Sequence, residues 1–124
     1  MIQGKDEGMI KGIGIDAVEI NRMAKIIETK PQFATRILTK KELALFTSHS
    51  AHRKVEFLAG RYACKEAFAK AWGTGIGEIS FQELEILRND AGAPYFAESP
   101  YKGKVFVTLT HTDTLAIAQV LLEE

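Results

Sequence analysis

The chain has 124 residues, of which 46% are hydrophobic and 26% are charged, and its 16 basic and 16 acidic side chains give a formal net charge of zero. This length suits one domain, and no apolar run is long enough to span a bilayer, so we expect no membrane segment. The balanced charge, and the lack of aromatic residues interleaved with basic ones, argue against a nucleic-acid partner.

The N-terminus carries a short repeat, because Met9-Ile10-Lys11-Gly12 echoes the pattern of Met1-Ile2-Gln3-Gly4. We interpret residues 1–8 as an extension, either an alternative start or an expression remnant, and residues 9–124 as the domain. The start lacks the apolar core of a signal peptide, and the single Cys64 has no cysteine to pair with inside the chain. A cytoplasmic, reducing location is therefore expected.

The first half of the chain predicts one strand followed by helices. Residues 9–16 alternate around two glycines and predict a strand that ends at Asp16. The remaining predictions are a helix over 17–28 that ends before Pro31, a short irregular segment over 33–38, a helix over 40–47 capped by Thr39, a polar connection over 48–52, a long helix over 54–72 and a glycine-rich turn over 73–77.

The second half predicts antiparallel strands. Residues 81–87 alternate, a turn follows at 89–92, and Tyr95 and Phe96 lie in a short return strand. Residues 105–111 and 115–122 then predict a hairpin. The fold class is therefore α+β, with an N-terminal strand and helices followed by an antiparallel sheet.

Asp16 has two interpretations. It precedes a predicted helix and is followed three residues later by Glu19, which is the spacing of a capping box. A carboxylate also offers about four lone-pair sites, so the same residue is able to bind a metal. The surrounding Gly-x-Gly-x-Asp pattern is not a dinucleotide fingerprint, because the third glycine is missing.

The long helix carries Glu66 and Lys70 one turn apart. Such a pair is either an ordinary surface interaction worth about 0.3–0.5 kcal/mol or the carboxylate and ammonium of a site for metal and phosphate. Tyr62 shares their stripe, and Arg61 and Lys65 lie on the neighbouring one, so we expect cations on two sides of Glu66.

Basic residues are concentrated in one part of the chain. Residues 22–70 contain eleven Lys or Arg and four Asp or Glu, a balance of +7, and the remainder balances at −7. Such a block favours phosphate groups or an acidic protein surface as partners. His49 and His52 lie three residues apart, but no third ligand accompanies them, so we do not expect a metal site there.

Four segments, in order and at matching intervals, resemble one family: the holo-acyl-carrier-protein synthases, the short form of the 4′-phosphopantetheinyl transferases. The resemblance runs from Met9 nearly to the C-terminus. The segments are GIGIDAVEI at 12–20, FATRILTKKEL at 33–43, EFLAGRYACKEAFAKAWGTGIG at 56–77 and VTLTHT at 107–112.

This resemblance implies an enzyme of fatty acid biosynthesis that moves the phosphopantetheine arm of coenzyme A onto a serine of apo-acyl carrier protein, releasing adenosine 3′,5′-bisphosphate. It implies Asp16 and Glu66 as ligands of Mg²⁺, which takes one or two carboxylates beside phosphate oxygens and water. Mn²⁺ suits the same ligands. Lys70 would reach the diphosphate, with Lys65 as a second candidate, and either Glu66 or a metal-bound water would deprotonate the serine.

The remaining roles also come from the resemblance. His111 would lie beside the coenzyme A phosphates, and Arg53 and Arg61 are weaker candidates for the 3′-phosphate. Arg22, Phe33 and Arg36 would dock the acidic carrier protein, although Thr29 and Gln32 stand where relatives often carry arginine, so we expect weaker electrostatic steering. The family fold implies a homotrimer with active sites between subunits.

Two other functions use overlapping residues. A metal-dependent hydrolase of coenzyme A or nucleotide diphosphates would use Asp16, Glu66 and Lys70 without a protein acceptor. A non-catalytic module that binds an acidic protein through residues 22–53 would need neither carboxylate.

Overall fold

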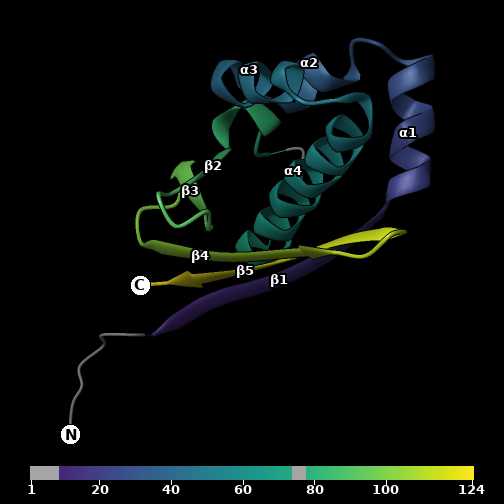
Figure 1. Cartoon of the computed structure of the whole chain (residues 1–124). Helices are drawn as coiled ribbons and strands as arrows, with labels where there is room; N and C mark the ends of the chain where they lie inside the picture. The colour runs from purple at the N-terminus through teal and green to yellow at the C-terminus, as the bar shows by residue number, and fades with distance from the viewer. Residues whose placement is uncertain (1–8, 74–77) are drawn as a thin grey trace, which may run out of the picture.

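The computed structural model describes residues 9–73 and 78–124. A three-stranded sheet carries the long helix α4 on one face, and the shorter helices gather around the N-terminal half of α4 (Figure 1). The elements are β1 (Ile10–Glu19), α1 (Ile20–Thr29), α2 (Phe33–Ile37), α3 (Lys40–Ser48), α4 (Ala51–Trp72), the 3-10 helix η1 (Phe81–Glu83), β2 (Glu85–Arg88), β3 (Pro94–Glu98), β4 (Lys104–His111) and β5 (Leu115–Glu123).

The main sheet has the strand order β1-β5-β4, and both pairings are antiparallel. β5 is central, so Ala118 lies between Asp16 on β1 and Leu109 on β4. Side chains at paired positions project from the same face of a sheet, and Ala118 is fully buried in the core beneath α4. Asp16 therefore projects from the face that α4 covers, at one edge of the sheet.

Two glycines of β1 allow the backbone of α4 to pack directly against the strand. A Cβ atom at Gly14 would collide with the carbonyl oxygen of Ala67, and one at Gly12 with that of Ala71. Further back along α4, Gly60 faces the Leu109 side chain of β4. The helix thus crosses the sheet obliquely, with its N-terminal half over β4 and its C-terminal half over β1.

Burial explains the small residues of α4. The helix buries Ala59, Ala63, Cys64, Ala67 and Phe68 completely. One apolar cluster fills the space between α4, the main sheet and β2, and the other joins α4 to α1, α2 and α3. The cap predicted at Thr39 is present at the start of α3 as part of a capping box, in which Thr39 accepts a hydrogen bond from the backbone N–H of Glu42.

Several predicted boundaries were wrong. β1 continues through Asp16 to Glu19, so Asp16 does not cap α1, and its capping interpretation is excluded. The segment predicted as irregular forms the short helix α2, and the first residues of the predicted strand over 81–87 form η1. The polar connection predicted over 48–52 is shorter, because α4 begins at Ala51.

Other predictions are confirmed. The hairpin of β4 and β5 and the return strand β3 are present, and α4 ends at Gly73, whose φ of 95° lies in the left-handed region. The strands of the second half do not form one continuous antiparallel sheet, because β2 and β3 form a separate two-stranded sheet. The predictions for residues 1–8 and for the turn residues 74–77 concern positions outside the described residues.

Within the ranges 9–73 and 78–124, no helix combines the length and apolar character that a membrane crossing requires.

Candidate active site

Asp16, Glu66 and Lys70 form a carboxylate site where β1 meets the C-terminal half of α4. Lys70 Nζ donates hydrogen bonds to Asp16 Oδ1 and to the carbonyl oxygen of Ile15, both at 3.0 Å. Glu66 is half-buried one helical turn before Lys70. The structure thus brings together the three side chains that the sequence singled out for metal and phosphate chemistry.

The two carboxylates repel each other. Burial raises the pKa of Glu66, and the negative charge of Asp16 raises it further, while Lys70 and the Tyr62 hydroxyl act in the opposite direction. Two carboxylates that lie close together and are partly shielded from solvent favour a bound cation, because its charge reduces the repulsion between them. Oxygen ligands of this kind suit Mg²⁺, which keeps its other positions for water and phosphate.

Lys65 does not belong to this site. Its ammonium is completely buried and contacts Glu42 Oε1 at 2.7 Å, the carbonyl oxygen of Ile37 at 2.6 Å and that of Phe81 at 3.1 Å. With three acceptors inside the core, it does not reach a diphosphate at the surface. This corrects the expectation of cations on two sides of Glu66, because only Lys70 approaches that carboxylate from α4.

Glu42 explains why the Lys65 ammonium remains in the core. Its Oε1 also accepts a hydrogen bond from the Thr39 amide at 2.9 Å, and its Oε2 accepts one from the Ile86 amide at 2.7 Å. Burial lowers the pKa of Lys65, and Glu42 counteracts that shift. The pair therefore ties α3 and β2 to α4 and has a structural function.

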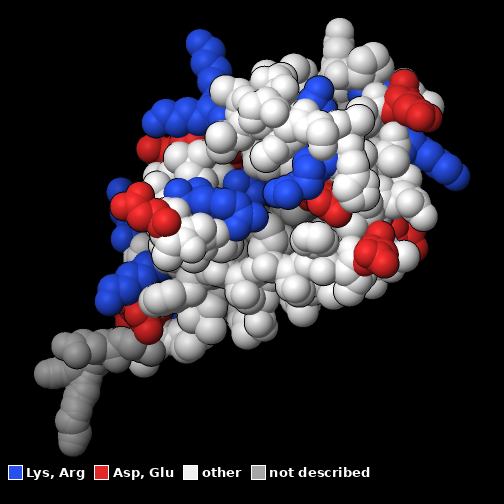
Figure 2. Space-filling model, viewed as in Figure 1, with Lys and Arg blue, Asp and Glu red and all other residues white. Residues whose placement is uncertain are grey.

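A second feature, the basic cavity, opens between α3, α4, β2 and β4. It has a volume of about 760 Å³. The residues that line it and carry nitrogen groups are Lys41, His49, Arg53, Arg61, Arg88 and His111. Figure 2 shows Lys and Arg side chains gathered across the middle of this face. An anionic ligand is the chemistry that such a wall favours.

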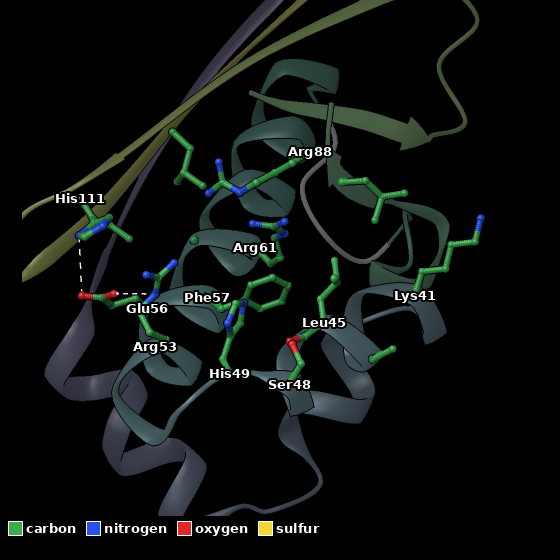
Figure 3. Close-up of a pocket in the computed structure, with 15 residues that line it drawn as sticks. Lys41, Leu45, Ser48, His49, Arg53, Glu56, Phe57, Arg61, Arg88 and His111 are labelled. Carbon is green, nitrogen blue, oxygen red and sulfur yellow. Dashed lines mark hydrogen bonds and ion pairs between the residues drawn. The ribbon is translucent and has the colours of Figure 1, made fainter. Parts of the chain in front are cut away.

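Glu56 organises one wall of the basic cavity. Its carboxylate lies 3.7 Å from Arg53 Nε and 4.0 Å from His111 Nδ1, and these contacts join α4 to the end of β4 (Figure 3). His52 contacts the same carboxylate at 3.2 Å. Arg53 and His111, which were expected at the coenzyme A phosphates, are thus held side by side and remain largely exposed.

Arg61 forms the floor of the basic cavity. Its guanidinium lies over the Phe57 ring, 4.2 Å from the centroid, and its Nε donates to the carbonyl oxygen of Ile86 at 3.2 Å. Only 1% of the residue is exposed, and burial lowers its pKa. Of the two arginines proposed for a phosphate, Arg53 is therefore the accessible one.

The carboxylate site and the basic cavity lie at opposite edges of the main sheet. Asp16 belongs to the edge strand β1, and His111 belongs to the other edge strand, β4, with β5 between them. Because α4 crosses the sheet obliquely, its Glu66 turn lies over β1 and its Gly60 turn lies over β4. One chain thus presents the two features on different sides of α4.

The expected docking residues lie on α1 and α2. Arg22 and Arg36 are exposed, whereas Phe33 is half-buried with its ring 5.9 Å from that of Tyr62. A second cavity of about 660 Å³ lies beside them, bounded by Phe33, Arg36, Tyr62, Phe81 and Gln82 among others. Tyr62 also stacks on Phe81 at 5.6 Å, so an aromatic wall connects α2 with α4 and η1.

Sequence reasoning missed several residues of these features. Arg88 follows no recognisable spacing and reaches the basic cavity only because β2 packs beside α4. Glu56 lies three residues after Arg53. This helical spacing indicates a surface ion pair and does not predict the contact of Glu56 with His111. Gln82 gave no signal at all.

Within the described ranges, no group of three or more His, Cys, Asp or Glu side chains is placed to hold a metal.

Comparison with known proteins shows which family this sequence resembles. The profile of the 4′-phosphopantetheinyl transferase superfamily matches residues 12–120. The holo-[acyl-carrier-protein] synthase of Enterococcus faecalis is 60% identical over 115 residues, which cover 93% of this chain and 98% of that protein. The enzyme of the same name from Streptococcus sanguinis is 53% identical over 116 residues, covering 94% and 97%.

A solved structure gives the same result for the fold. The crystal structure of a holo-(acyl-carrier-protein) synthase from Bacillus anthracis in complex with CoA (3′,5′-ADP) matches with a TM-score of 0.88 and 42% identity, covering 94% of this chain and 98% of that one. The profile spans both the carboxylate site and the basic cavity, and the relatives match over nearly their whole length. The chain therefore belongs to the 4′-phosphopantetheinyl transferase superfamily.

Proposed function

We propose that this protein transfers the 4′-phosphopantetheine group of coenzyme A to a serine of apo-acyl carrier protein, giving holo-acyl carrier protein and adenosine 3′,5′-bisphosphate. The observation that carries the proposal is the convergence of Asp16, Glu66 and Lys70 at one point, in a chain 60% identical to a holo-[acyl-carrier-protein] synthase. In the reaction, the serine oxygen bonds to the phosphorus that carries the pantetheine arm, and the bond from that phosphorus to the bridging oxygen breaks.

Each residue of the carboxylate site has a role in this proposal. Asp16 and Glu66 hold a divalent cation, Mg²⁺ or Mn²⁺, which when bound would neutralise charge on the diphosphate. Lys70 places its ammonium against the diphosphate as a point charge, since phosphoryl transfer depends mainly on positioning and charge stabilisation. The serine proton leaves through the Glu66 carboxylate or through water.

The basic cavity is proposed to bind the nucleotide end of coenzyme A. Arg53 and His111 would contact its phosphates, and Arg61 and Arg88 would add positive charge behind them. The complex of the Bacillus anthracis relative with CoA (3′,5′-ADP) supports a nucleotide site in this fold. Arrangement of cations around a concave wall is the electrostatic pattern that a phosphate ligand needs.

Because the two features lie on different sides of α4, we propose that one active site combines the carboxylate site of one subunit with the basic cavity of a neighbour, within a homotrimer. The outer face of the main sheet supports an assembly of this kind. Ile13 and Ile15 on β1 and Phe106 on β4 are 58%, 56% and 51% exposed. Such neighbouring apolar side chains favour burial against another protein surface.

The exposed faces of α1 and α2 are proposed to dock the carrier protein. Arg22 and Arg36 would pair with acidic side chains, and Phe33 would supply an apolar anchor. The reaction is assigned to the cytoplasm in this proposal, since the buried free thiol of Cys64 suits a reducing compartment.

The test is the intact mass of an apo-acyl carrier protein after incubation with this protein, coenzyme A and Mg²⁺. We expect a gain of one phosphopantetheine that a chelator abolishes, and that the Asp16→Asn and Glu66→Gln variants do not produce. The matched control is Glu124→Gln, a carboxylate distant from both features. Cleavage of coenzyme A without a mass gain would instead indicate a hydrolase, and full activity in both carboxylate variants would contradict the metal site.

A further inference from the structure

The C-terminal end of α2 is held by side chains from two other elements. Gln82 Nε2 donates to the carbonyl oxygens of Thr35 and Arg36, each at 3.1 Å, and to that of Leu38 at 2.9 Å. The carbonyl oxygen of Ile37, which lies between Arg36 and Leu38 in the chain, accepts a hydrogen bond from Lys65 Nζ at 2.6 Å. Four successive carbonyl groups, from residue 35 to residue 38, therefore have side-chain donors.

These contacts matter because α2 has only five residues. A helix this short is unstable by itself, and the last carbonyl groups of any helix lack partners within the helix. The amide nitrogen of Gln82 offers two N–H groups, which are shared among three acceptors, and only this end of the amide suits a group of carbonyl oxygens. Gln82 and Lys65 thus supply the partners that the helix itself lacks.

Both donors are fixed in position. Gln82 belongs to η1, where its backbone N–H donates a hydrogen bond to the Ser80 hydroxyl at 3.1 Å. Lys65 belongs to α4 and is the direct neighbour of Glu66 in the chain. The orientation of α2 is therefore set relative to the helix that carries the carboxylate site.

We propose that Gln82, assisted by Lys65, is a positioning residue for the carrier-protein step: it fixes α2 so that Phe33 and Arg36 meet the carrier protein in a constant relation to Glu66. This inference depends on the proposed function, in which Phe33 and Arg36 dock the carrier. Gln82 acts through α2 and does not contact the reacting atoms. No residue of α2 lines the basic cavity, which is the proposed nucleotide site, so we expect the effect of Gln82 to be confined to the protein substrate.

The experiment measures steady-state kinetics and amide hydrogen exchange of the full-length Gln82→Ala variant. We expect the KM for apo-acyl carrier protein to rise about tenfold, a size typical of lost side-chain hydrogen bonds. The kcat and the KM for coenzyme A should change less than about twofold. The Leu38 amide, which donates to the Ala34 carbonyl oxygen at 2.9 Å, should exchange about tenfold faster as α2 loosens. Gln82→Glu should act in the same direction, because a carboxylate has no donors for the carbonyl groups.

The matched control is Glu83→Ala, which removes a cap of η1 but no contact with α2. It should leave both the KM for the carrier and the exchange of Leu38 unchanged. Faster exchange in Gln82→Ala without a change in KM would overturn the proposal, since the contacts would then be structural only. A higher KM without faster exchange would also overturn it, because Gln82 would then contact the carrier directly, and so would an equal effect of Glu83→Ala.

The wild-type protein separates this inference from the proposed function. If the wild type transfers phosphopantetheine and Gln82→Ala behaves like it, only the positioning role is wrong. A wild type without transferase activity would overturn the proposed function and, with it, the docking role on which this inference depends.

Discussion

The ammonium of Lys70 lies 3.0 Å from the carboxylate of Asp16, although 54 positions separate the two residues in the chain. The contact joins the C-terminal half of α4 to β1, and the close backbone packing at Gly14 makes it possible. Lys70 also reaches the carbonyl oxygen of Ile15 at 3.0 Å, so its side chain is held at the carboxylate site by two acceptors.

Replacing Lys70 with methionine should lower kcat for phosphopantetheine transfer by about 100- to 1000-fold, the range typical of removing one group that stabilises developing charge. Lys70→Arg should retain part of the activity, because it keeps the charge but changes its geometry. The measurement is initial velocity at saturating substrates, with Lys11→Met as a control at an exposed position. Equal rates for Lys70→Met and the wild type would show that the ammonium has no part in catalysis.

Mixing two inactive variants should restore activity if each active site combines residues from two subunits. Asp16→Ala leaves the basic cavity intact, whereas Arg53→Ala with His111→Ala leaves the carboxylate site intact. Coexpressed in one cell, the two chains should form mixed assemblies in which some sites contain both intact halves. Transfer activity well above that of either variant alone is the expected result.

The control for this experiment is a mixture of the two separately purified, already assembled variants, which should remain inactive as long as subunits do not exchange. Absence of activity after coexpression, with mixed assemblies detected by mass spectrometry, would show that one chain supplies the whole site.

Glu42→Ala should destabilise the protein by about 3–5 kcal/mol, because it leaves the Lys65 ammonium buried without its carboxylate. Glu42→Gln should also be destabilising but less so, since the amide oxygen still accepts a hydrogen bond. The measurement is the free energy of unfolding from urea titration. Glu28→Ala, at an exposed position on α1, is the control and should change stability by less than about 0.5 kcal/mol.

If Glu42→Ala unfolds at the same urea concentration as the wild type, the Lys65–Glu42 pair does not hold α3 and β2 to α4. A double replacement, Glu42→Leu with Lys65→Met, should recover part of the lost stability, because no unpaired charge then remains in the core.

Cys64 should resist thiol reagents in the folded protein. Its side chain is fully buried, and burial raises the pKa of the thiol to about 12. Since the thiolate is the reactive form, labelling with a chromogenic disulfide reagent at pH 8 should be slow in the native state and rapid, at one thiol per chain, in denaturant. Rapid labelling of the native protein would show that α4 opens readily.

The same pKa shift links Cys64 to stability. The pKa of the thiol in the unfolded chain is about 8.5. Between this pH and the folded-state pKa of about 12, the folded state therefore retains a proton that the unfolded state loses. The contribution of this group to stability is therefore fully present at neutral pH and decreases as pH rises through that window. Cys64→Ala should lack this part of the alkaline decrease.

Local patterns determined much of this protein from the sequence. Helical spacing predicted α4 and its glycine end, Thr39 as a cap predicted the start of α3, and strand alternation predicted the final hairpin. The Glu66–Lys70 pairing on one stripe of α4 followed from the same spacing. These features depend on interactions between residues close in the chain, which the sequence displays directly.

The tertiary structure decided which side chains face solvent and which face the core. Lys65 and Glu66 are adjacent in the sequence, yet one is completely buried against Glu42 and the other lies beside Asp16. The pairing of β1 with β5 continues to Glu19, which places Asp16 within the strand instead of at a helix cap. The glycines of β1 allow α4 to approach this strand closely.

The position of Gln82 at the end of α2 also arises only from long-range packing. Periodicity shows which residues share a face of a helix or strand. Which element covers that face depends on the burial of apolar surface across the whole chain, and a short stretch of sequence does not contain this information.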